Sequence, residues 1–195
     1  MLFYHGSTIA GLTELHPQLP IYAHIQEPLV YLTTSRQLAL HYIWDTERIG
    51  VKMPMLDIRK DGVLVFQEMF PNALEYFYKG VSGYIYHCEG DYAINPDSCV
   101  PTCATSRETV LVTDCEYIEN VHEEILDYLE RGKLIYEHYE DLPIWRKDVI
   151  RGHIMRFIKR NNLLNDPKQP GLRFICEKFP QYWAEAQVLN EKNLF

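Results

Sequence analysis

The sequence lacks long hydrophobic runs and a targeting segment at its amino terminus. No window approaches 18 uninterrupted apolar residues, the length that makes a membrane-spanning helix the expectation. The first residues also contain no basic region followed by an apolar stretch, which a secretory signal peptide requires. We therefore expect no transmembrane helix, no signal peptide and no membrane partner, and we predict a cytoplasmic protein.

Cysteines are few and do not form a disulfide framework. The chain has five, which is an odd number, at irregular spacing: Cys88, Cys99, Cys103, Cys115 and Cys176. A zinc site built from Cys99 and Cys103 with His87, Cys88 or Cys115 is the alternative, because thiolates four residues apart can share one ion. The spacing lacks the paired knuckles of structural zinc sites, so we predict reduced, mostly apolar thiols and no metal.

The chain also lacks the excess of basic residues that a generic nucleic-acid binder needs. It has 19 Lys and Arg residues against 27 Asp and Glu residues, a formal net charge of −8 at pH 7. One local basic stretch runs from residue 146 to residue 160, and cations on such a helix form a solvated face more often than a nucleic-acid contact. No generic DNA binding is expected.

What is present is the composition of an ordinary soluble globular protein. Of the 195 residues, 47% are hydrophobic and 24% are charged. No internal repeat, low-complexity tract or flexible linker interrupts the sequence. The length suits one good core, or a domain with an appended subdomain.

The first 115 residues alternate irregularly between strand-like and helix-like segments. Strands are predicted at 2–5, 29–33, 54–58, 62–67, 83–89 and 108–114. Helices are predicted at 35–44 and 72–79, after the capping residues Ser35 and Asn72, and Lys60-Asp61-Gly62 is typical of a hairpin turn. Residues 90–107 are rich in polar residues without a clear period, which predicts a long loop. The pattern favours an α+β domain of split antiparallel sheets over a parallel βαβ array.

From about residue 117 the periodicity becomes helical. Apolar residues at helical spacing predict a helix ending near Gly132, a second from about Pro143 to Leu164 and a third after Pro180. We therefore divide the chain into a core over residues 1–116 and a helical C-terminal extension over residues 117–195, docked on the core.

Two short motifs carry the functional interpretation. Phe3-Tyr4-His5-Gly6-Ser7 and Val30-Tyr31-Leu32-Thr33-Thr34 each place polar groups at the end of a strand-like run. Glycine lets backbone approach a ligand closely, and a tyrosine offers its face to a flat cationic ring, a contact that gains roughly 0.5–2 kcal/mol. Nicotinamide in NAD is such a ring, and the His5 imidazole suits a ribose hydroxyl.

Together, the two motifs and the alanine-containing helix after Tyr31 resemble the ADP-ribosyltransferase-like fold family, in particular its His-Tyr-Glu class and the rifampin-modifying enzymes. The resemblance covers about the first 115 residues. It implies NAD bound between two split antiparallel sheets, with His5 holding the nicotinamide ribose and Tyr31 stacking on nicotinamide. Gly6 and Ser7 would meet the dinucleotide with their backbone, Thr33 would support the site, and Tyr42 would add a second aromatic wall.

The third member of the family's triad is an acidic residue that stabilises the cationic ribose as nicotinamide leaves. Glu108 precedes the β-branched run 109–112, as in the Arg-Glu-containing strand start of the rifampin-modifying enzymes, and is our choice for this role. In those enzymes the catalytic acid lies upstream of that strand, so Asp91 is a close rival, with Glu89 and Asp97 behind it.

The resemblance implies a transferase, more narrowly a glycosyltransferase, that moves ADP-ribose from NAD to an acceptor and releases nicotinamide. The acceptor, whether protein, nucleic acid or small molecule, stays open. Two alternatives remain: a non-catalytic NAD- or nucleotide-binding module of the same fold, and an NAD-dependent RNA 2′-phosphotransferase. The phosphotransferase needs several arginines to hold RNA phosphate, and Arg36, Arg59 and Arg107 are scattered in the sequence.

Overall fold

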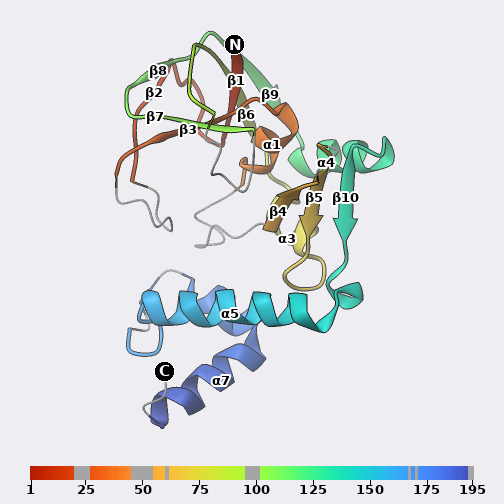
Figure 1. The fold of residues 1–195 in the computed structure, drawn as a ribbon, viewed down its shortest axis with the longest axis vertical. Helices are drawn as coiled ribbons and strands as arrows, with labels where there is room; N and C mark the ends of the chain where they lie inside the picture. The colour runs from red at the N-terminus through yellow and green to blue at the C-terminus, as the bar shows by residue number, and fades with distance from the viewer. Residues whose placement is uncertain are drawn as a thin grey trace. The chain divides into compact units, whose positions relative to one another are not determined.

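Strand β1 (Leu2–Ser7) lies at the centre of a five-stranded sheet (Figure 1). The computed structural model describes residues 1–19, 27–44, 55–59, 62–94, 102–166, 168–169 and 171–192. The strand order is β7-β3-β1-β6-β9, formed with β3 (Val30–Thr33), β6 (Gly83–Glu89), β7 (Cys103–Ser106) and β9 (Asp114–Ile118), and the neighbouring strands are antiparallel. The predicted α+β class is confirmed as a mixed fold with a mostly antiparallel sheet.

In the described part of the chain, two smaller sheets accompany the central one. Strand β2 (Glu14–Leu15) pairs with β8 (Val110–Leu111), and β4 (Met55–Ile58), β5 (Leu64–Gln67) and β10 (Leu134–Glu137) form a three-stranded sheet in the order β10-β5-β4. One face of the central sheet and the β2–β8 pair enclose a core of seven buried residues: Phe3, Leu15, Val30, Leu32, Cys88, Ala104 and Val110. Alternation along β3 buries Val30 and Leu32 and leaves Tyr31 40% exposed.

Among the described residues, the helices are α1 (Arg36–His41), α3 (Ala73–Tyr78), α4 (Val121–Glu130), α5 (Ile144–Arg160), α6 (Leu172–Lys178) and α7 (Pro180–Glu191), with a 3₁₀ turn at Tyr139–Asp141. The predicted Ser35 cap is confirmed, because its hydroxyl accepts the N–H of Leu38 at 3.2 Å. At the start of α3 the N–H of Ala73 instead donates to the carboxylate of Glu68, and Asn72 has the left-handed φ of 60°.

The described residues group into two compact units, each discontinuous in sequence. Residues 1–44, 56–66 and 74–136 form the first, which contains the central sheet, α1 and α4. Residue 55 and residues 67–73 and 137–192 form the second, in which α5 packs against α7 and α6 packs against α7. Across the described residues, no helix combines the length and apolar character needed to cross a bilayer.

Several elements differ from the sequence prediction. The stretch 90–107 contains strand β7 because its four residues pair with β3 and Ala104 is buried in the core, although Cys-Ala-Thr-Ser has no strand-like composition of its own. The strand predicted over 108–114 is divided between β8, which pairs with β2, and the start of β9, which pairs with β6. Helix α6 and strand β10 were not predicted. Lys60 and Asp61 of the predicted turn lie outside the described residues, whereas Gly62 has φ 84° and donates to the carbonyl of Arg59 at 2.8 Å.

Candidate functional site

The two motifs meet where strands β1 and β3 stop pairing. Strand β1 pairs with β6 along all six residues, but its register with β3 is the single pair Tyr4 with Thr33. One residue further along β1, the His5 Nδ1 atom lies 2.9 Å from the main-chain oxygen of Tyr31. The imidazole therefore takes the place of a ladder hydrogen bond at the point of separation, and the structure brings the two predicted residues together.

This hydrogen bond assigns the tautomer of His5. A carbonyl oxygen only accepts, so the proton of the bond belongs to Nδ1. In the neutral ring Nε2 then carries the lone pair and is the acceptor. An acceptor nitrogen held by the backbone of the neighbouring strand is suited to a hydroxyl donor such as that of a ribose.

Tyr31 presents a partly exposed ring beside an ion pair. Partial burial, together with the nearby charge of Glu27, raises the pKa of the Tyr31 hydroxyl. Glu27 is bound by Arg107, with 3.0 Å from both Nε and Nη2 of the guanidinium to the two carboxylate oxygens. Glu27 was not among the predicted site residues. Its sequence neighbours do not predict its ion pair beside Tyr31, because its partner Arg107 lies 80 residues further along the chain.

The glycine of the first motif is closely packed on one side. A Cβ atom at Gly6 would lie 2.0 Å from the carbonyl oxygen of Ala39 in α1 and 3.1 Å from the Ile43 side chain. Gly83, on the neighbouring strand, faces the same helix end, with Ile43 Cγ2 at 2.3 Å and the Ser7 carbonyl oxygen at 2.7 Å. The absence of a side chain at both positions is thus explained by close packing around α1, and the role of Gly6 toward a dinucleotide stays a prediction.

Ser7, Thr33 and Tyr42 lie on elements around this junction. The Ser7 hydroxyl accepts the N–H of Ile9 at 3.1 Å. Thr33 is buried; its hydroxyl donates to the Thr102 hydroxyl at 3.1 Å and accepts the N–H of Ser35 at 3.0 Å, which fixes the turn from β3 into α1. Tyr42, just after α1, is 43% exposed, with its ring centroid 6.4 Å from that of Trp44.

The candidate acids lie at opposite ends of the sheet. Glu108 is two residues beyond Ser106, which pairs with Val30, whereas Asp91 is two residues beyond Glu89, which pairs with Leu2 at the far end of β1. Tyr31 pairs with Thr105, so Glu108 is three residues from the partner of Tyr31 along one neighbouring segment. Glu108 is exposed, and its main-chain N–H donates to the Ser106 hydroxyl at 3.1 Å.

Asp97 and Cys99 lie outside the described residues. Within the described part of the chain, no group of three His, Cys, Asp or Glu side chains is arranged to hold a metal ion. Cys88 is buried, and that burial raises the pKa of its thiol to about 11, so it is a neutral apolar side chain at neutral pH.

Arg36 fixes the start of α1. Its guanidinium donates to both carboxylate oxygens of Glu116 on β9, to the Tyr128 hydroxyl at 2.9 Å and pairs with Glu124 at 2.6 Å, the latter two on α4. The hydrogen bonds that Arg36 donates to Glu116, more than any other cause, raise the pKa of Arg36. Arg36 and Arg107 are therefore each engaged by carboxylates of the protein itself.

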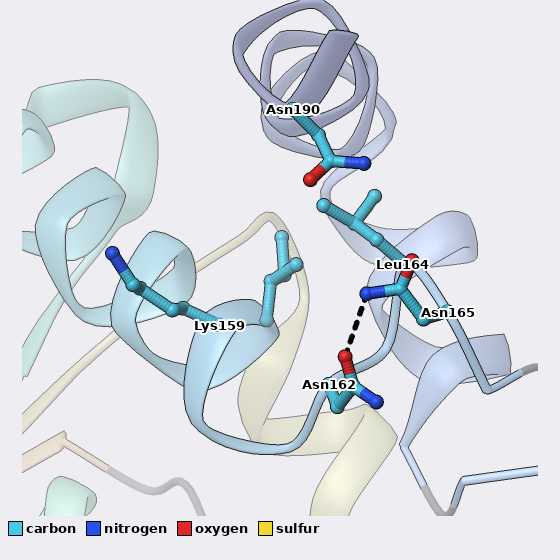
Figure 2. A pocket seen from close by; sticks show the side chains of 6 residues that line it. Lys159, Asn162, Leu164, Asn165 and Asn190 are labelled. Carbon is cyan, nitrogen blue, oxygen red and sulfur yellow. Dashed lines mark hydrogen bonds between the residues drawn. The ribbon is translucent and has the colours of Figure 1, made fainter. Parts of the chain in front are cut away.

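A small hollow lies in the second unit, at the end of α5. It measures about 150 Å³ and is lined by Ile158, Lys159, Asn162, Leu164, Asn165 and Asn190. Figure 2 shows the amide of Asn165 turned toward Asn162, to which it donates at 2.7 Å. Drug-sized ligand pockets measure about 300–1,000 Å³, so this hollow suits a few waters or one small polar group rather than a dinucleotide.

Comparison with known proteins finds no matching family model, no matching curated protein and no matching solved structure.

Proposed function

We propose that the first unit binds NAD at the β1–β3 junction and transfers ADP-ribose to an acceptor with release of nicotinamide. The single observation that carries the proposal is the hydrogen bond between the His5 imidazole and the Tyr31 carbonyl at the point where the two strands stop pairing. It supports a site because it orients a ring-nitrogen acceptor beside a partly exposed tyrosine ring, two groups suited to ribose and to nicotinamide.

The proposed roles follow from this placement. His5 accepts a hydrogen bond from a ribose hydroxyl, and Tyr31 stacks on nicotinamide. Glu108, at the Val30 end of the sheet, stabilises the positive charge that develops on the ribose as the glycosidic bond breaks. A carboxylate is required for this step because the transition state resembles an oxocarbenium ion.

The arginine contacts disfavour the phosphotransferase alternative. That activity needs guanidinium groups available to a substrate phosphate, and Arg36 and Arg107 already form bidentate contacts with Glu116 and Glu27. Breaking either contact would leave a carboxylate without its cation.

The test is calorimetric titration of the purified protein with NAD, with nicotinamide release measured on the same samples. Tyr31→Ala should weaken NAD binding roughly twofold to thirtyfold, from the ~0.5–2 kcal/mol of a cation–ring contact. Tyr117→Ala is the matched control, because Tyr117 is also a strand tyrosine of this sheet and is 57% exposed. Equal affinity in the wild type and Tyr31→Ala would refute the assignment of Tyr31.

The catalytic acid is tested separately. Glu108→Gln should keep NAD affinity and lower the rate of nicotinamide release about 100-fold or more, since a single electrostatic group of this kind contributes ~2.7–4 kcal/mol. Asp91→Asn is its control. A loss confined to Asp91→Asn moves the role to that residue, and binding without release in the wild type favours the non-catalytic binding module.

A further inference from the structure

Helix α5 concentrates positive charge in an otherwise acidic protein. Its 17 residues include six Lys and Arg side chains and one acidic side chain, Asp148, which gives a formal charge of +5. The whole chain has 19 basic and 27 acidic residues, so the other 178 residues have 13 basic and 26 acidic ones. A local positive field of this kind attracts an anionic partner that the rest of the chain would repel.

One side of α5 is buried and the other is exposed along its full length. The buried residues are Ile150, Ile154, Phe157 and Ile158. At about 100° per residue, Trp145, Val149, His153, Arg156 and Arg160 fall within an arc of about 80° on the other side, and all five are exposed. We call these five residues the α5 stripe; the helix is light blue in Figure 1.

The stripe begins with an exposed aromatic ring. Trp145 is 58% exposed, and the guanidinium carbon of Arg146 lies 4.7 Å from the centroid of its ring. This cation–π contact holds the indole in place on the helix surface. An indole fixed in this way is a stacking platform, and every nucleic-acid base has a face able to stack on it.

The basic residues divide between those beside the stripe and those within it. Arg151 lies off the stripe and is paired with Glu185 on α7, and Lys147 donates to the carbonyl of Glu140 at 3.0 Å. Arg156 and Arg160 lie within it, four residues apart, so they sit one above the other on successive turns. Two exposed guanidinium groups in line with a tryptophan match a phosphate backbone that carries bases.

The mixture of charge and apolar surface within the stripe argues against a lipid surface as the partner. A helix that lies on a membrane buries an apolar face and keeps its cations on the opposite or flanking face. In the stripe, Arg156 falls between Trp145 and Val149 around the helix axis, so inserting the aromatic ring would carry the guanidinium into the bilayer.

We propose that the α5 stripe binds single-stranded nucleic acid, with a base stacked on Trp145 and phosphates held by Arg156 and Arg160. From Trp145 to Arg160 the helix rises about 22 Å, which is about six nucleotides at 3.4 Å each. This surface belongs to the second unit and is independent of the NAD site proposed above.

The experiment is a fluorescence anisotropy titration of the full chain, without NAD, using labelled oligouridine and oligothymidine of about 15 nucleotides and a mixed-sequence duplex. The variants are R156Q/R160Q and W145A. The matched control is R131Q/K133Q, which removes the same charge from exposed positions of the first unit. Circular dichroism verifies that each variant keeps the wild-type helix content.

We expect the wild type to bind a single strand more tightly than the duplex. R156Q/R160Q should weaken binding at least tenfold. It should also reduce the magnitude of the negative slope of log association constant against log salt concentration by about 1.4 over roughly 50–200 mM salt, at about 0.7 for each lost phosphate contact. W145A should weaken binding about fivefold or more, as the loss of one stacked base predicts. The control should change affinity less than twofold; binding of either RNA or DNA supports the proposal, and the comparison identifies the preferred sugar.

Three results would overturn it. The first is no anisotropy change with any single strand at low salt. The second is an equal loss of affinity in R131Q/K133Q and R156Q/R160Q, which would reduce the effect to net charge. The third is binding to phosphatidylserine vesicles without binding to oligonucleotides, which would make the stripe a membrane-contacting face.

Discussion

Substitution of Gly6 by alanine should destabilise the first unit through a single added methyl group. The new Cβ would lie 2.0 Å from the Ala39 carbonyl oxygen, 3.0 Å from the Ala39 carbonyl carbon and 3.1 Å from Ile43 Cγ1. The first two are backbone atoms within α1, so no side-chain rotation relieves the overlap, and α1 or β1 has to move. Overpacking of this kind costs about 1–3 kcal/mol.

The opposing contribution is smaller. Alanine restricts the unfolded chain, which stabilises by about 0.4–1 kcal/mol where its backbone conformation is allowed. A net loss of about 1–2 kcal/mol remains, which lowers the melting temperature by about 2–8 °C for a chain of this size.

Gly152→Ala is the matched control for this prediction. Gly152 lies inside α5, and its added Cβ would have Arg156 Nη1 at 3.5 Å, an ordinary contact with a flexible side chain. Replacing a helical glycine with alanine stabilises by about 1 kcal/mol. Thermal unfolding followed by circular dichroism should therefore show opposite shifts for the two variants, and a melting temperature of Gly6→Ala at or above that of the wild type would disprove the close packing of α1 on β1.

Four further predictions concern buried or paired ionisable groups. Arg36→Gln should lower the melting temperature by several degrees, because Glu116 and Glu124 lose a shared cation. The double variant Arg36→Gln/Glu116→Gln should recover part of this loss. Strictly additive effects of the two substitutions in this double-mutant cycle would argue against the Arg36–Glu116 ion pair. The hydrogen bond from Arg36 lowers the pKa of Glu116, so the ionised carboxylate stabilises the fold above about pH 4.5, and this stabilisation is lost as pH falls through the lowered pKa. Urea unfolding at pH 3 to 6 should show that the free energy of unfolding depends less on pH in Glu116→Gln than in the wild type. Burial lowers the pKa of His41 to about 4 from 6.5, so the free energy of unfolding should fall as pH decreases from about 6.5 to about 4. His41→Leu should remove this pH dependence. Equal slopes of unfolding free energy against pH in the wild type and the variant would exclude a contribution from His41. Glu68→Gln should destabilise by about 1–3 kcal/mol, because the buried carboxylate accepts the N–H groups of Ala73 and Tyr139, each at 3.0 Å; unchanged urea unfolding would show that the negative charge at Glu68 does not matter.

Local signals were sufficient where an element is stabilised by its own sequence. Strand β6 and helix α5 have strong strand and helix patterns, and Ser35 caps α1 as its residue type predicts. Strand β7 shows the limit of such signals. Cys-Ala-Thr-Ser is extended because β3 offers it four pairing partners, which are residues about 70 positions earlier in the chain.

The start of α3 has the same explanation. Asn72 is a favourable capping residue by type, but the N–H of Ala73 bonds to the carboxylate of Glu68, five residues upstream. Glu68 also accepts the N–H of Tyr139, so one buried acid joins two segments that are 71 residues apart. A local propensity scale cannot choose between Asn72 and Glu68 as the cap of α3, because the contact of Glu68 with Tyr139 is long-range.

The candidate site combines both kinds of information. The exposure of Tyr31 between buried Val30 and Leu32 follows from strand alternation and was predictable, whereas the hydrogen bond that joins its carbonyl to His5 depends on how far β1 and β3 stay paired. A His-Gly pair at a strand end is equally compatible with a ligand close to the glycine and with a helix close to the glycine. In this chain the helix is present on the Cβ side of Gly6, so a ligand at the junction must approach His5 and Tyr31 from elsewhere around the separated strands. For that reason Gly6→Ala is expected to act first on stability, whereas Tyr31→Ala, which removes an exposed ring, is the variant that separates nicotinamide binding from folding.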